Sequence, residues 1–315
     1  MGKRGIDMRG KNRTVALAYL GIIFVVFIWG VSPIAKKLLI GDRYSASIYS
    51  TVTSLAGACA LLVISLKKLK ALNREHFKYA LPTGLCISVA AFLQAIAYNF
   101  DASPTNQAFL ENLSCVTVPL ILFFAIQKRP TTLTVTASAV CLLSSMVLSG
   151  VIGGGGNFYA VDILNAMAGI LYGVNIAVTG MCAKKCIPQL YVMIQLFVQT
   201  FFSAVMTVVF NFASIGGSSV DPFVFTNNVW LILAVIGIGI ITKAVCWTVR
   251  AKAMKHVSSG AVAVIMPLSA VVTSVVAIAM GQDSLSVSLV VGSVLGLAAS
   301  FMSAAGDIKE NAKKK

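Results

Sequence analysis

Charged side chains are scarce in this sequence. Only 11% of the 315 residues are Asp, Glu, Lys or Arg, and 58% are hydrophobic. Soluble domains carry roughly 25% charged and 45 to 50% apolar residues. A soluble chain of this length would need far more charge to cover its surface. The shortage therefore indicates an integral membrane protein.

Groups that carry enzymatic chemistry are also few. The two histidines, His76 and His256, lie at the edges of long apolar runs, and no HExxH motif, GxSxG motif or pair of carboxylates occurs within a run. The glycines at 153 to 156 are not followed by the Lys-Ser helix start of a nucleotide-binding loop. We therefore predict that the protein is not an enzyme and has no metal or cofactor site.

The cysteines do not indicate disulfides. All seven fall inside apolar runs or at the edge of one. Cys182 and Cys186 are one helical turn apart beside two lysines, but no His or third Cys stands nearby to complete a metal site. We interpret these two as buried small apolar side chains.

Long apolar runs are what the sequence has in abundance. A transmembrane helix needs about 20 mostly apolar residues. The candidate spans are residues 14 to 40, 44 to 66, 79 to 100, 103 to 126, 131 to 152, 158 to 182, 188 to 212, 228 to 250, 258 to 280 and 284 to 305. These runs are continuous, unlike the short alternating segments of a membrane β-barrel. The sequence predicts an all-α integral membrane protein with ten transmembrane helices.

Basic residues outnumber acidic ones by 25 to 10. Most lie in the two tails and in the loops after predicted spans 2, 4, 6 and 8, which share one side of the membrane if the spans alternate. The positive-inside rule places that side in the cytoplasm. This explains the charge without a nucleic-acid partner. We predict a multi-pass protein of the plasma (inner) membrane, with residues 1–13 and 306–315 as basic cytoplasmic tails.

The beginning of the chain is not expected to be a cleavable signal peptide. Its first apolar run exceeds 20 residues, and no small-residue cleavage site precedes the next predicted span. We therefore expect this run to remain in the protein as the first transmembrane helix.

Short motifs of the first half recur in order in the second half. The "WGVS" from Trp29 recurs as "YGVN" from Tyr172, and "ENLSCV" from Glu111 aligns with "MPLSAV" from Met266. The fifth predicted span likewise resembles the tenth. Because each copy holds an odd number of spans, the second copy enters the membrane from the opposite side. This predicts inverted five-helix repeats, residues 14–152 and 158–305, around a central cavity.

The motifs resemble the EamA-type branch of the drug/metabolite transporter superfamily. The resemblance rests on "WG" in predicted span 1, on "SPTNQAFLENLSCVTVPLI" in span 4 and on "SSGAVAVIMPLSAVV" in span 9, and it covers about residues 15 to 305. It implies cytoplasmic termini, a central substrate cavity and export of amino acids or other metabolites. Two features depart from the family: span 2 lacks an arginine found in many relatives, and Glu111 and Asn112 replace the more usual apolar residues or proline.

Polar side chains within the spans are the candidate site. A carboxylate in hydrocarbon costs several kcal/mol unless it is neutralised, paired or turned toward a watery cavity. We therefore assign functional roles to Glu111 and Lys243 and assign the serines and threonines to helix packing. The predicted substrate-binding residues are Trp29, Gln94, Tyr98, Glu111, Asn112, Tyr172, Asn175, Lys243 and Trp247.

Glu111 is also the predicted coupling residue, and its charge depends on a partner. Counted inward from the outer boundary, Glu111 lies about 12 Å deep, Lys36 about 6 Å and Lys243 about 23 Å. A lysine stem reaches across the first gap more easily, so we predict an ion pair with Lys36. The alternative is that Lys36 and Lys37 extend to the outer headgroups.

These features predict a secondary active transporter that works by alternating access. The expected activity is export of a small polar metabolite, with proton coupling through Glu111 as an option. The carboxylate, amides and aromatic rings suit an amino acid or an organic cation. An anion held by Lys243 is a second option for the substrate.

Several alternatives stay open at this point. They are a membrane-embedded enzyme, a facilitative carrier or importer of a different small metabolite, and a gated channel. The expected partners are a small-molecule substrate and the lipid bilayer, and protons and a homodimer partner also remain open.

Overall fold

The protein is described here from a computed structural model. The described residues are 2–40, 42–98, 100, 107, 110–127, 131–148, 152, 160–212, 221, 223–281 and 287–313. Every regular element within them is a helix, and the only extended pairings are isolated bridges at Tyr44. The all-α prediction is therefore confirmed. The glycines at 153 to 156 and the predicted start of span 4 lie outside the described residues.

Among the described residues, seven helices are long and apolar enough to cross a membrane. Their elements are α1 (Gly2–Leu39), α2 (Ala46–Ser65) with η1 (Leu66–Ala71), α3 (Arg74–Tyr98), α7 (Ala160–Cys182), α8 (Pro188–Phe212), α9 (Val229–Gly239) with η3 (Ile240–Val245) and α10 (Cys246–Ala253), and α11 (Ser259–Ile265) with α12 (Leu268–Ala279).

Three further helices contain shorter apolar segments. They are α5 (Ser114–Ile126), preceded by η2 (Glu111–Leu113), α6 (Thr132–Leu148) and α13 (Val287–Lys313). Each of the predicted spans thus contains an apolar helix. Length and composition qualify seven of these helices as membrane spans, so ten crossings stay a prediction.

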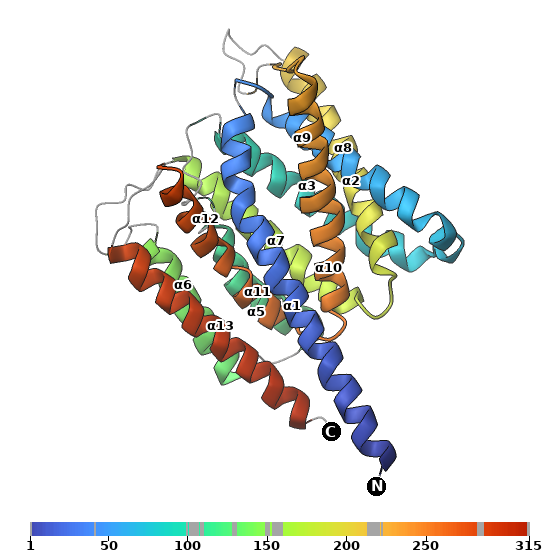
Figure 1. The fold of residues 1–315 in the computed structure, drawn as a ribbon, viewed down its shortest axis with the longest axis vertical. Helices are drawn as coiled ribbons and strands as arrows, with labels where there is room; N and C mark the ends of the chain where they lie inside the picture. Colours follow the sequence, from blue (N-terminus) through green and yellow to red (C-terminus); the bar gives the residue numbers. More distant parts are fainter. Residues whose placement is uncertain are drawn as a thin grey trace.

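The helices pack along one another as a bundle (Figure 1). Helices α6 and α13 lie side by side on one flank, α2 packs against α8 and α9, and α3 packs against α7 and α8. Helix α1 contacts α12 and α10, while α5 contacts α7. The beginning of α1 and the end of α13 lie at the same end of the bundle, the lower end in Figure 1.

The bundle has apolar side chains outside and many polar side chains inside. Phe124, Phe201 and Phe301 are more than 70% exposed, whereas Gln94 and Arg250 are at most 2% exposed. Apolar exposure on this scale is unfavourable in water and favourable in hydrocarbon. This arrangement supports a multi-pass membrane protein. Cys182 and Cys186 are buried and free, as predicted.

A carboxylate from a distant part of the chain caps the beginning of α2. The Asp221 carboxylate accepts hydrogen bonds from the amides of Ala46 (2.7 Å) and Ser47 (3.0 Å) at the beginning of α2. A carboxylate is favourable there because the first amides of a helix lack partners and carry partial positive charge. Tyr44 stacks edge-to-face on Phe225 beside this cap, so the segment before α9 is joined to the α1–α2 turn.

Three helix interruptions lie in the middle of the bundle. Pro267 has no amide hydrogen and separates α11 from α12. The short 3-10 helix η2, which has no proline, precedes α5, and the π-helix η3 interrupts the span between α9 and α10. Interruptions of this kind are common at functional sites because they release backbone groups and redirect side chains.

Candidate functional site

A cavity lies among these interruptions, between helices from both predicted halves. Its volume is about 100 Å³. One water needs about 10–15 Å³ of such a volume, so the cavity has room for several waters or one small metabolite. Its polar and aromatic lining comprises Trp29, Ser32, Lys36, Tyr49, Ser50, Thr53, Gln94, Glu111, Ser114, Tyr172, Gln199, Thr242, Lys243, Trp247, Arg250 and Ser269.

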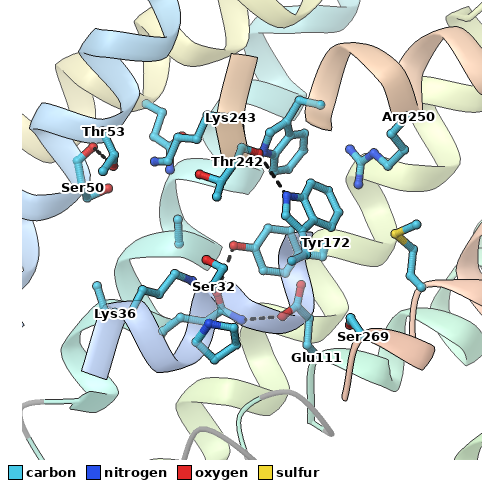
Figure 2. A pocket seen from close by; sticks show the side chains of 18 of the residues that line it. Ser32, Lys36, Ser50, Thr53, Glu111, Tyr172, Thr242, Lys243, Arg250 and Ser269 are labelled. Carbon is cyan, nitrogen blue, oxygen red and sulfur yellow. Dashed lines mark hydrogen bonds between the residues drawn. The ribbon is translucent and has the colours of Figure 1, made fainter. Parts of the chain in front are cut away.

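Most of the side chains predicted for the site meet at this cavity (Figure 2). The predicted residues that line it are Trp29, Lys36, Gln94, Glu111, Tyr172, Lys243 and Trp247. Two others lie just behind the wall: the Tyr98 hydroxyl donates to the carbonyl of Pro33 at 3.2 Å, and Asn175 accepts from Arg250. The side chain of Asn112 is outside the described part of the chain.

Gln94, on α3, connects three of these side chains. Its amide nitrogen donates to Oε2 of Glu111 at 3.0 Å, and its oxygen accepts from the Tyr172 hydroxyl at 3.1 Å and from Nζ of Lys36 at 3.4 Å. In the structure Lys36 and Glu111 are thus joined through Gln94 rather than by a direct ion pair. Sequence spacing predicted the two charges as partners, and the structure places the Gln94 amide between them.

Arg250, on α10, is the main residue of the cavity that the sequence analysis missed. Its position at the end of predicted span 8 is typical of a basic residue that marks the cytoplasmic side, but Arg250 is 2% exposed and lines the cavity. Its guanidinium carbon lies 4.2 Å from the ring centroid of Trp247 and 5.3 Å from that of Trp29, and it donates to Asn175. Aromatic faces and an amide oxygen stabilise a buried guanidinium.

A pattern in the sequence could have identified Arg250. Lys243, Trp247 and Arg250 stand at positions i, i+4 and i+7, which share one face of a helix. Lys243 is the only lysine deep within predicted span 8. Because Arg250 shares its helix face, the pattern predicts that Arg250 lies on the same surface.

The π-helix η3 fixes the position of this face. The amide of Cys246 passes over the Thr242 carbonyl and donates to those of Ile241 and Lys243. The Thr242 carbonyl instead accepts a hydrogen bond from the indole nitrogen of Trp29 at 3.0 Å. The irregular turn that carries Lys243 is therefore attached to α1 across the cavity (Figure 2).

The charged groups of the cavity are unequal in number. Within the described part of the chain, Lys36, Lys243 and Arg250 face a single carboxylate, that of Glu111. Lys36 and Lys243 extend into the cavity from one side and Arg250 from the opposite side (Figure 2). Such a cavity can bind a polar molecule through ionic hydrogen bonds, with aromatic rings for its carbon skeleton.

Comparisons with known proteins match this chain to a transporter family and to a solved fold. Residues 163–305 match the EamA-like transporter family, which confirms the resemblance predicted from the sequence. A solved structure titled "Crystal structure of protein" superposes with a TM-score of 0.68, covering 95% of this chain and 98% of its own chain at 13% identity. That likeness concerns the fold alone. A comparison with curated proteins gives no match.

Proposed function

We propose that this protein is a secondary active transporter that carries a small polar metabolite through the central cavity by alternating access. The observation that carries the proposal is the cavity itself, where ionisable and amide side chains from both predicted halves converge inside an apolar bundle. Ionisable residues at membrane depth are costly and mark substrate pathways. The match of the second half to EamA-like transporters supports the same activity.

The pairing of helices supports the inverted repeats on which alternating access depends. Helix α1 packs against α12 and α10, and α7, which aligns with α1 in the sequence, packs against α5 and α3. Likewise α2 packs against α9 and η3, while α8 packs against α3. These contacts are equivalent when the first five predicted spans are exchanged with the last five. Two equivalent sets of contacts allow two equivalent conformations, one open to each side.

Two glycines make this correspondence specific. A Cβ atom on Gly30 of α1 would lie 2.5 Å from Cβ of Val272 and 2.8 Å from the carbonyl oxygen of Ser269. A Cβ atom on Gly173 of α7 would lie 2.7 Å from Cβ of Thr117 and 3.2 Å from Cα of Ser114. The glycines belong to "WGVS" and "YGVN", and their contact residues align in spans 4 and 9. Each glycine permits the same close helix contact.

Proton coupling and export belong to the same proposal. Glu111 lines the cavity and is hydrogen-bonded to Gln94, so a bound substrate would experience any change in its charge. A proton taken up by Glu111 on one side and released on the other would link the proton gradient to substrate movement. Export is the direction that the resemblance to EamA-type transporters implies.

We also propose that the protein lies in the plasma membrane with both termini in the cytoplasm. The test uses two exposed loop positions, Asn227 before α9 and Ala71 at the end of η1. In intact cells, a membrane-impermeant thiol reagent should label Asn227→Cys and should not label Ala71→Cys beyond the level of the unsubstituted protein. The reverse pattern would invert the assigned orientation.

Transport itself is tested with the purified full chain in liposomes. A metabolite mixture is supplied outside, a proton gradient is imposed without ATP, and the interior is measured by mass spectrometry. We expect at least one small polar metabolite to accumulate with this protein and none with empty liposomes. Ser269→Trp should fill the cavity and stop uptake, whereas Phe301→Trp, on the outer face of α13, should not.

The same preparation distinguishes the alternatives. Chemical conversion of a metabolite by the detergent-solubilised protein, without uptake into liposomes, would favour a membrane-embedded enzyme. Ion conductance without accumulation against a gradient would favour a channel. Either result would refute secondary transport.

A further inference from the structure

The charge of the cavity identifies a substrate class. Among the described residues, its lining contains three cationic side chains, Lys36, Lys243 and Arg250, against the single carboxylate of Glu111. Charges taken out of water are costly unless they are paired or hydrogen-bonded. A cavity with a surplus of positive charge therefore favours a ligand with a surplus of negative charge.

Among the described residues, the cationic side chains of the cavity have unused donors, and the neutral amide oxygen of Gln199 is an unused acceptor. Glu111 already accepts from Gln94, whereas Lys243 has no hydrogen-bond or ion-pair partner among the described residues. Nε of Arg250 is buried and unpartnered within the same part of the chain. Both are obligate donors. The groups that complete them must be acceptors, and anionic oxygens are the strongest acceptors available.

Building on the proposed transport function, we propose that the substrate is a small organic anion with two acidic groups, one bound between Lys36 and Lys243 and the other presented to Arg250. The cationic side chains enter from opposite sides of the cavity, so we assign one acidic group to each side (Figure 2). Trp29, Tyr172 and Trp247 lie between them and contact the carbon skeleton.

An organic cation fits this cavity less well. Two of the aromatic rings expected to bind it are those of Trp29 and Trp247, and the guanidinium of Arg250 already lies over both. It would also have to overcome repulsion from three cationic side chains, with one carboxylate to attract it. The aromatic residues that suggested a cationic substrate from the sequence thus bind a cation of the protein itself.

Binding to the purified wild-type protein tests the charge of the ligand. The probes have similar length and different charge: succinate, 3-phosphonopropionate, 4-aminobutyrate and putrescine. We expect succinate or 3-phosphonopropionate to raise the unfolding temperature in a saturable manner, and the comparison of these two distinguishes carboxylate from phosphate-like recognition. Stabilisation by 4-aminobutyrate or putrescine alone, or by none of the probes, would overturn the proposal.

Substitutions test which side chains bind the anion. Lys243→Gln and Arg250→Gln should each weaken binding of the stabilising anion by about 10- to 150-fold, the value of a hydrogen bond to a charged group. Lys252→Gln removes an exposed lysine from α10 and should leave affinity unchanged. If Arg250→Gln fails to fold, Lys243→Gln still tests the proposal. Lys243 makes no hydrogen bond or ion pair with a described residue, so its substitution should leave the fold intact. Unchanged affinity in Lys243→Gln would refute the assignment.

Counterflow in liposomes separates this proposal from the proposed function. Exchange of labelled 4-aminobutyrate or putrescine, without exchange of either anion, would keep the transporter and reject the anionic substrate. Binding of an anion that is sensitive to Lys243→Gln, without exchange of that anion, would keep the binding site and reject transport.

Discussion

The two helix junctions beside the cavity are aligned in the sequence and differ in chemistry. Glu111 in η2 and Met266 between α11 and α12 are aligned in the sequence, and both line the cavity. A serine follows three residues later in each case, Ser114 and Ser269, and also lines it. One junction thus presents a carboxylate where the other presents a thioether followed by proline.

The difference between Glu111 and Met266 helps to distinguish the backbone features that support packing from the side chain that faces the substrate. Both junctions stand beside a close helix contact, of α5 with α7 and of α12 with α1. The α12–α1 contact forms with Met266 at the matching position, without a carboxylate. Glu111 is therefore the side chain by which the two junctions differ chemically, and substitutions at matched positions test whether this matters for transport.

The largest effect is expected at Glu111. Glu111→Gln keeps the size and the hydrogen-bonding capacity of the side chain and removes its titration. If Glu111 couples protons, the variant should lose gradient-driven accumulation completely and retain counterflow exchange. Met266→Gln, its matched control at the other junction, should accumulate substrate normally. Equal loss in both variants, or accumulation by Glu111→Gln, would show that the junctions do not differ in this way.

A smaller effect is expected at the two glycines where α1 contacts α12 and α7 contacts α5. Gly30→Ala and Gly173→Ala would each place a Cβ atom within 3 Å of a packed helix. Overpacking of this kind costs about 1–3 kcal/mol, so the unfolding temperature should fall in both variants by similar amounts. Gly237→Ala is the control, because nothing lies within 4 Å of the added atom. A loss in only one of the two glycine variants would contradict the equivalence of the contacts.

The smallest effect concerns a hydrogen bond that only one junction helix makes. The Thr273 hydroxyl of α12 donates to the Gly30 carbonyl at 2.7 Å, while the aligned residue on α5 is Val118. Thr273→Val should therefore lower stability by about 0.5–1.5 kcal/mol. Ser274→Ala should cost less, since the Ser274 hydroxyl bonds within its own helix. The measurement is the unfolding temperature of both variants in the same detergent.

Much of the fold could be predicted because hydrocarbon imposes simple rules. Apolar length predicts helices, and each predicted span contains an apolar helix. The repeated motifs also identified matching positions, such as Trp29 and Tyr172, which both line the cavity. The shorter apolar segments of α5, α6 and α13 show the limit of this rule, because composition identifies a span without fixing where its helix begins.

The site was predicted less completely, and Arg250 and Gln94 show why. Arg250 stands near a helix end, where basic residues usually mark membrane orientation, so its burial against two tryptophans from different helices is a matter of packing. Gln94 was expected to line the site, but its position between Lys36 and Glu111 depends on how α1, α3 and η2 come together.

The sequence by itself determined the class of protein, because its shortage of charge and its long apolar runs suit only a bilayer. It also determined that Glu111 and Lys243 would not face lipid, since an ion there costs several kcal/mol. Only the tertiary structure decided which charges share the cavity. Lys36 and Arg250 lie 214 positions apart in the chain, and both line the cavity with Glu111 and Lys243 because α1, η2, η3 and α10 converge around it. Electrostatic energy depends on distance in space, and helix packing sets that distance.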